Sequence, residues 1–307
     1  MRHDDFTPSA PRPGRRRGPG LAAAALAGVC LTASGCAGDG GSGPGAGPAT
    51  ASRSAPSTPS SSPSAAPDPS PSTGPTSSKP LPRGPLTGRT VVIDPGHNPG
   101  NRDHTREIGA QVDIGTGRKE CDTTGTATDA GYAEARFTLD VSRRLRTLLE
   151  EQGARVVLTQ DGDRPFGPCV DERARIGNNE RADAVVSVHA DGSAAGNRGF
   201  HVILPAAVKG GGADTAKIVA PSRELGERIA GNFVRATGSA PSNYLGDGTG
   251  LDTRDDLGGL NLSTVPKVFV ECGNMRDPED AALLTRGGWR QKAALGIAEG
   301  IGSYLKR

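Results

Sequence analysis

The sequence predicts an α/β fold with a mostly parallel, mixed central sheet and helices on both of its faces. Strand and helix patterns alternate along residues 88–307, which is typical of a parallel sheet. Three runs rich in apolar residues, each with the pattern of a buried strand, precede a residue that can bind a metal or transfer a proton. These pairs are Val91–Ile93 with His97, Ala184–Val188 with His189, and Val268–Val270 with Glu271. Because parallel strands end at one edge of a sheet, we expect one site at the C-terminal ends of these strands.

The individual elements follow from local patterns. The first strand is expected at residues 90–94, where Asp94-Pro95-Gly96 stops it with a turn. A loop rich in glycine, threonine and aspartate at 98–130 leads to a helix at 132–151, in which apolar residues recur every three or four positions. A long polar loop is expected at 238–262, and loops of that length are often functional. The other expected elements are strands at 155–159, 184–188, 199–204 and 266–270, and helices at 170–181, 222–237 and 290–305.

Residues 1–36 have the pattern of a secretory signal. A basic start with Arg15–Arg17 precedes the apolar run Leu21–Thr32, which is too short to span a bilayer stably. The following Ala33-Ser34-Gly35-Cys36 resembles the end of a bacterial lipoprotein signal, in which Cys36 would carry the lipid and become the mature N-terminus. Cleavage by an ordinary signal peptidase and an uncleaved anchor are the alternatives. We therefore expect an extracytoplasmic protein, either lipid-anchored to the outer face of the cytoplasmic membrane or secreted.

Composition separates a tether from a single folded domain. Residues 37–87 consist largely of Gly, Ser, Pro, Ala and Thr and carry too little apolar surface to offset the entropy of ordering, which predicts a disordered tether. Residues 88–307 are long enough for one domain with a proper core. The net charge of +2 and the aromatic content of 3% give no support for nucleic-acid binding. We expect a monomer.

The two strand-end histidines, His97 and His189, suggest a metal site. One such histidine is usually structural, but two at the ends of parallel strands would meet at one edge of the sheet. A catalytic zinc ion takes three protein ligands and keeps one position open. Glu134, in the first turn of helix 132–151 and at the start of its inward stripe, is the preferred third ligand, although a glutamate there also complements the helix dipole. Spacing leaves three rival ligands, which are Asp122, Asp129 and Asp191.

Glu271 and the cysteines complete the candidate residues. Glu271 follows a buried strand, so its carboxylate needs either a cation or a role beside a metal, and a general base for a metal-activated water meets that need. A structural ion pair is the alternative. Cys121 and Cys169 lie in Gly-, Pro- and Asp-rich loops and are expected to form a disulfide in an oxidising compartment, while Cys272 is expected to be buried and reduced.

As a set, these segments resemble the zinc-dependent N-acetylmuramoyl-L-alanine amidases of the bacterial cell wall, over about residues 88–305. The resemblance implies that His97, Glu134 and His189 hold one Zn²⁺ per chain and that Glu271 is the catalytic carboxylate. It also implies that peptidoglycan is the substrate and that zinc-activated water cleaves the amide between N-acetylmuramic acid and L-alanine. The segments that carry it are Ile93–His97, Glu134, Ser187–Asp191 and Val270–Met275. Another zinc-dependent wall peptidase and a non-catalytic wall-binding lipoprotein are the alternatives.

More narrowly, Lys119–Thr126 and Gly167–Ala174 resemble the single-domain branch of actinobacterial, mycobacterial-type enzymes, which also implies a disulfide between Cys121 and Cys169. The sequence departs from the family pattern in two places. Asn98-Pro99 follows His97 where two glycines are common, which would reshape the substrate groove, and Cys272 stands where an aliphatic residue is more usual.

Overall fold

The computed structural model describes residues 82–306. The predicted signal, the lipidation residue Cys36 and most of the predicted tether lie outside the described residues. The folded part begins earlier than the predicted boundary at residue 88. Leu86 is fully buried, and its N–H donates a hydrogen bond of 2.9 Å to the carbonyl oxygen of Gln152. Residues 84–87 therefore pack against the domain and are not part of a tether.

Six strands of the described chain form the central sheet, in the order β4-β1-β5-β10-β6-β9. Every neighbouring pair is parallel except β10 and β6, which are antiparallel. The fold is thus the predicted mixed and mostly parallel α/β architecture. The strand bounds are β1 Thr90–Pro95, β4 Arg155–Leu158, β5 Ala184–Asp191, β6 His201–Pro205, β9 Leu251–Arg254 and β10 Lys267–Asn274.

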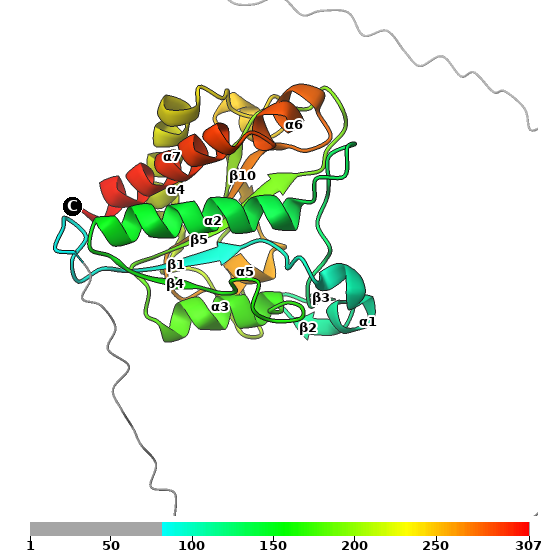
Figure 1. The fold of residues 1–307 in the computed structure, drawn as a ribbon. Helices are drawn as coiled ribbons and strands as arrows, with labels where there is room; N and C mark the ends of the chain where they lie inside the picture. The colour runs from blue at the N-terminus through cyan, green and yellow to red at the C-terminus, as the bar shows by residue number, and fades with distance from the viewer. Residues whose placement is uncertain (1–81, 307) are drawn as a thin grey trace, which may run out of the picture. The chain divides into compact units, whose positions relative to one another are not determined.

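Helices cover both faces of this sheet, as predicted (Figure 1). Successive residues of a strand point to opposite faces, so Val91 and Ile93 join the large core while Val92 joins a small cluster on the other face. The large core is closed by α2 (Glu134–Glu151), α4 (Val219–Thr237) and α7 (Gly287–Leu305). The other face is covered by α3 (Val170–Asn179) and the short α5 (Gly258–Asn261).

The structure adds short elements that the sequence did not predict. In the expected loop 98–130 they are η1 (Asn101–Asp103), α1 (Thr105–Ile108) and a hairpin of β2 (Gln111–Asp113) and β3 (Arg118–Glu120). Elsewhere they are β7 (Lys209–Gly210), β8 (Ala213–Asp214), η2 (Gly246–Gly248) and α6 (Pro278–Leu284). Strand β9 likewise lies within the loop expected at 238–262. Within residues 82–306, no helix is both long enough and apolar enough to cross a membrane.

Candidate active site

His97 lies directly after the turn that ends β1. Its backbone has a φ of 58°, in the left-handed region that few residues other than glycine adopt. The preceding Gly96 packs against the ring of His189 so closely that a Cβ would lie 2.3 Å from the ring. The Thr138 hydroxyl on α2 donates a hydrogen bond of 2.6 Å to the carbonyl oxygen of Gly96. The turn is therefore fixed between the end of β5 and the start of α2.

His97, Glu134 and His189 meet at this point. Each offers one ligand atom, and these atoms all lie within 4.8 Å of one another. Glu134 lies between the two rings, with one carboxylate oxygen 3.3 Å from Nε2 of His97 and the other 2.9 Å from Nδ1 of His189. The rings lie edge to face with centroids 5.0 Å apart. The structure thus brings the two strand-end histidines and the preferred third residue together.

The rival third ligands do not converge with these donor atoms. The Asp129 side chain is exposed and forms an ion pair of 2.8 Å with Arg276. Asp191 accepts a hydrogen bond of 2.6 Å from the Tyr244 hydroxyl. Asp122 is close to the site, but its carboxylate contacts the Nδ1 side of His97, away from Glu134. None of the three belongs to the group of converging donor atoms among the described residues.

The electrostatics of the group favour a cation. Burial raises the pKa of the Glu134 carboxyl, but the rings of His97 and His189 outweigh burial and hold that pKa well below its usual value. Burial lowers the pKa of His97, but the Glu134 and Asp122 carboxylates outweigh it and hold that pKa well above its usual value. Two imidazoles and one buried carboxylate also form a donor set that suits zinc. The residues present therefore fit a metal ion at this position.

Glu271 lies beside the group, on β10. It is the register partner of His189 on the parallel strand β5 and of His201 on the antiparallel strand β6, so the three side chains leave the same face of the sheet. One carboxylate oxygen of Glu271, Oε2, is buried and has no hydrogen-bond partner among the described residues. Burial, and then the carboxylates of Glu134 and Asp191, raise the pKa of Glu271 well above its usual value. A perturbed, unpartnered carboxyl beside a donor cluster is typical of a catalytic group.

The cysteines surround the same region. A disulfide joins Cys121 to Cys169. Cys121 immediately precedes Asp122 in the sequence. Cys272 is the free cysteine of the described residues, and it is buried next to Glu271 in the sequence. Burial raises the pKa of the Cys272 thiol well above its usual value, and the Glu271 and Glu134 carboxylates add to this effect, so the thiol stays protonated.

A family model and similar proteins of known function show which family the chain belongs to. The family model described as N-acetylmuramoyl-L-alanine amidase matches residues 91–303. The chain belongs to this family. An N-acetylmuramoyl-L-alanine amidase of Mycobacterium tuberculosis is 41% identical over 225 residues, which is 72% of this chain and 88% of that protein. AmiA, an N-acetylmuramoyl-L-alanine amidase of Escherichia coli, is 26% identical over 256 residues, which is 74% of this chain and 80% of that protein.

Solved structures agree with this amidase assignment. The crystal structure of the amidase Ami1 from Mycobacterium smegmatis superposes with a TM-score of 0.65 at 41% identity, covering 72% of this chain and 98% of that one. The apo form of Ami1 from Mycobacterium abscessus gives a TM-score of 0.66 at 41% identity, covering 72% of this chain and 100% of that one. The predicted family and its mycobacterial-type branch are therefore confirmed.

The sequence did not predict two buried cations of this amidase, Arg173 and Lys267. The carboxylate of Asp94 forms an ion pair with each of them. A signal for Arg173 was available, because Arg173, Ala174 and Gly177 are spaced to share one face of α3 and are its buried residues.

The departure Asn98-Pro99 has a structural role in this amidase. The Asn98 amide group donates a hydrogen bond of 3.0 Å to the carbonyl oxygen of Gly167, and its oxygen accepts one of 2.8 Å from the N–H of Gly100. The side chain is 3% exposed, so it fastens the His97 loop to the loop that carries Cys169.

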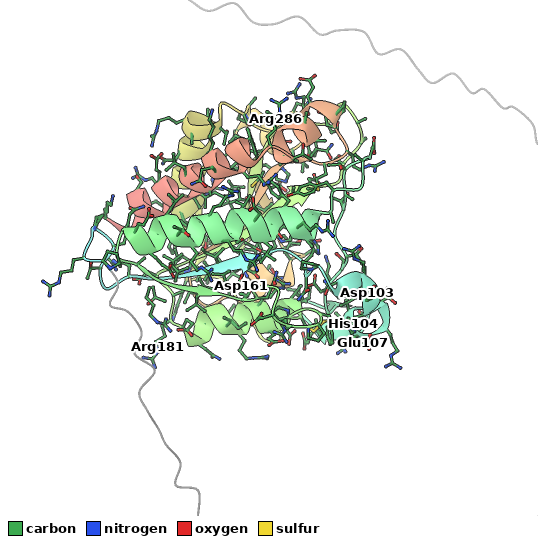
Figure 2. The ribbon with its side chains drawn as sticks, viewed as in Figure 1. Asp103, His104, Glu107, Asp161, Arg181 and Arg286 are labelled. Carbon is green, nitrogen blue, oxygen red and sulfur yellow. A yellow bond between two sulfur atoms is a disulfide. The ribbon has the colours of Figure 1, made fainter. Side chains whose placement is uncertain are left out.

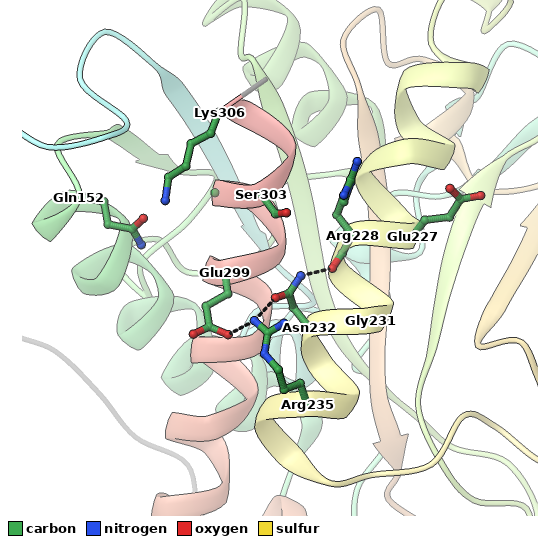
Figure 3. A pocket seen from close by; sticks show the side chains of 10 residues that line it. Gln152, Glu227, Arg228, Gly231, Asn232, Arg235, Glu299, Ser303 and Lys306 are labelled. Carbon is green, nitrogen blue, oxygen red and sulfur yellow. Dashed lines mark hydrogen bonds and ion pairs between the residues drawn. The ribbon is translucent and has the colours of Figure 1, made fainter.

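Two hollows of the described chain differ in their position relative to the converging donor atoms. A cavity of about 270 Å³ is lined by both histidines and also by Lys119, Leu257 and Phe269. A larger hollow of about 650 Å³ lies at the C-terminal end of α7 (Figure 3). There, Arg235 pairs with Glu299 and Asn232, and Gln152 marks the end of α2 opposite to Glu134. Only the smaller cavity lies where the donor atoms converge.

The other described histidines lie outside the donor group. His104 lies beside Glu107 at α1 (Figure 2). The ring of His104 also contacts the ring of Phe166, with centroids 5.1 Å apart. His201 is buried on β6, and its Nδ1 has no hydrogen-bond partner among residues 82–306.

Proposed function

We propose that this protein is a peptidoglycan hydrolase that cleaves the amide bond between N-acetylmuramic acid and the L-alanine of the stem peptide, with one Zn²⁺ per chain. His97, Glu134 and His189 hold the metal, and Glu271 acts as the general base. The observation that carries the proposal is the convergence of three donor atoms within 4.8 Å beside an unpartnered carboxylate, in a member of the amidase family.

Each residue has a distinct task. A bound Zn²⁺ would polarise the scissile carbonyl and lower the pKa of a water molecule to about 7. Glu271 accepts the proton of the attacking water, because its Oε2 has no hydrogen-bond partner in the described part of the chain. The same carboxyl then donates that proton to the amine of L-alanine as the bond to the lactyl carbonyl breaks. Glu134 is held for its task by the N–H groups of Thr126 and Ala190, at 2.9 and 3.2 Å.

Metal removal tests this proposal. Dialysis against a strong chelator should release about one zinc ion per chain and abolish release of peptides from purified peptidoglycan. Added Zn²⁺ should restore the activity, whereas Mg²⁺, which prefers oxygen ligands, should not. Full activity in a protein shown to be free of transition metals would refute the zinc assignment.

We also propose an extracytoplasmic monomer that is tethered to the cytoplasmic membrane. The support is the signal pattern of residues 1–36, the polar composition after it, and a family whose members act on the cell wall. A lipid-modified Cys36 would carry more than one acyl chain, which stable anchoring needs. Cys36→Ser should abolish labelling by a radioactive fatty acid. A lipid-free parent protein in the medium, with a different N-terminus, would refute anchoring but not export, and sedimentation of the soluble form tests the monomer.

A further inference from the structure

A chain of buried charges runs from the interior of the domain to His97. Nζ of Lys267 lies 2.9 Å from Oδ2 of Asp94, and Oδ1 of Asp94 lies 2.8 Å from Arg173. Arg173 lies 2.9 Å from Oδ2 of Asp122, whose Oδ1 lies 3.3 Å from Nδ1 of His97. Positive and negative groups alternate along this chain. The four charged residues that lead to His97 are each at most 6% exposed, so the chain is shielded from solvent.

Stability alone does not account for this arrangement. Taking charges out of water is costly, and well-packed apolar residues often serve a fold equally well or better. Buried carboxylates that end on an imidazole have a known use, because a metal-ligating histidine commonly donates its second N–H to a carboxylate or a carbonyl. The chain ends on His97, which is one of the proposed ligands.

Asp122 is held rigidly by its neighbours. The preceding Cys121 is bonded to Cys169, and its carbonyl oxygen accepts a hydrogen bond of 2.7 Å from the N–H of Val170. The guanidinium of Arg173 contacts Asp122 and also donates hydrogen bonds of 2.6 and 2.8 Å to the carbonyl oxygens of Pro95 and Pro168. Arg173 therefore ties the end of β1, the disulfide loop and Asp122 into one unit.

This unit fixes the orientation of the His97 ring. Nδ1 faces Asp122 at 3.3 Å and the hydroxyl and carbonyl oxygens of Thr123 at 3.2 and 3.1 Å, while Nε2 faces Glu134 at 3.3 Å. We propose that Asp122, clamped by Arg173, is a positioning residue that holds Nδ1 of His97 and so presents Nε2 to the metal. The proposal rests on the zinc site of the proposed function, but assigns Asp122 a role that is neither ligand nor catalytic base.

Zinc affinity of the purified full-length protein, measured by competition with a chromophoric chelator, tests the proposal. Asp122→Asn should raise the zinc dissociation constant about tenfold to hundredfold, the usual effect of removing such a partner. The matched control is Thr159→Val, because the Thr159 hydroxyl donates a hydrogen bond of 2.7 Å to Asp94 and so belongs to the same network without touching Asp122. This control should unfold at a lower temperature but bind zinc normally.

The results separate the possibilities. Normal zinc affinity in Asp122→Asn, or an equal loss of affinity in Thr159→Val, would overturn the proposal, since the second result would mean that Asp122 acts only through stability. Long-range ¹H–¹⁵N spectra of the unaltered zinc-loaded protein give a test that needs no variant. The metal should be on Nε2 of His97 and a proton on Nδ1, and a metal-bound Nδ1 would overturn the proposal. Absence of zinc binding to the unaltered protein would overturn the proposed function as well.

Discussion

Replacing Glu271 with glutamine should abolish catalysis while leaving the fold and the metal in place. The amide has the shape of the carboxylate, and the only change is at a group whose Oε2 has no hydrogen-bond partner among the described residues. Glutamine cannot accept the proton of the attacking water. The loss of a general base is usually a factor of about 10² to 10⁴, which raises the barrier by about 3 to 5 kcal/mol.

Stability gives this variant a second readout. In the metal-free protein the pKa of Glu271 is raised by burial and by the carboxylates of Glu134 and Asp191. A carboxyl with a raised pKa stabilises the fold at low pH, and that contribution is lost as the pH rises through the folded-state pKa. The glutamine variant has no such loss, so at pH 7 its metal-free form should unfold at a temperature no lower than that of the parent protein.

The assay compares three proteins. Initial rates of muropeptide hydrolysis should be measured at saturating zinc, with zinc content determined on the same samples. Glu279→Gln is the matched control, because Glu279 lies on α6, is 70% exposed and pairs with Arg198. It should keep full activity. A Glu271→Gln protein that has lost its zinc, or that keeps more than about a tenth of the parent rate, would refute the assignment of Glu271 as a base with a typical contribution.

Further predictions concern the metal, the thiols and the buried charges. Each of the variants His97→Ala, Glu134→Ala and His189→Ala lacks one proposed ligand and should bind zinc much more weakly. Competition with a chelator measures this affinity, and normal affinity in a variant would exclude that residue as a ligand. Thiol labelling of exported, unreduced protein cut back to the described residues should modify Cys272 only, and only after unfolding, so labelling of Cys121 would contradict the disulfide. Asp94→Asn should lower the free energy of unfolding at pH 7 by about 3 to 5 kcal/mol, because it leaves Lys267 and Arg173 buried without their shared carboxylate. Burial raises the pKa of Asp94, but Lys267 and Arg173 hold it far below its usual value, so its contribution is present at neutral pH and lost in acid. Denaturant unfolding should therefore show the gap between variant and parent narrowing from pH 7 to pH 3, and a constant gap would contradict the ion pairing.

The sequence predicted the strands that are buried on both faces and missed the short, polar ones. Val91–Ile93 and Val268–Val270 are short apolar runs rich in β-branched residues, and that length and composition favour a buried strand over a helix. Strand β9, Leu251–Arg254, has one apolar residue and forms because it pairs with β6 at the edge of the sheet. The antiparallel direction of β6 also depends on a tertiary contact, its pairing with β10. By contrast, α6 carried a readable signal, since Asp277 caps it and Pro278 occupies its first turn.

The residues that converge at the site were found for the same reason. His97, His189 and Glu271 follow apolar strands, and strand ends are a place where a sequence fixes position in space. The helical stripe made Glu134 the preferred third ligand, but spacing did not exclude Asp122, and the family resemblance then raised Glu134 well above it. The contact between Asp122 and His97 was not predictable, since it depends on how Arg173 and the disulfide fold the loop back over the end of β1.

Product analysis tests the central claim most directly. Purified peptidoglycan or a defined muropeptide should be digested with the zinc-loaded protein, and the products identified by mass spectrometry. Cleavage of the proposed bond yields stem peptides with a free L-alanine amine and glycans with an unsubstituted N-acetylmuramic acid carboxyl. Products cut within the stem peptide, with L-alanine still joined to N-acetylmuramic acid, would contradict the proposed reaction even if the zinc site were intact.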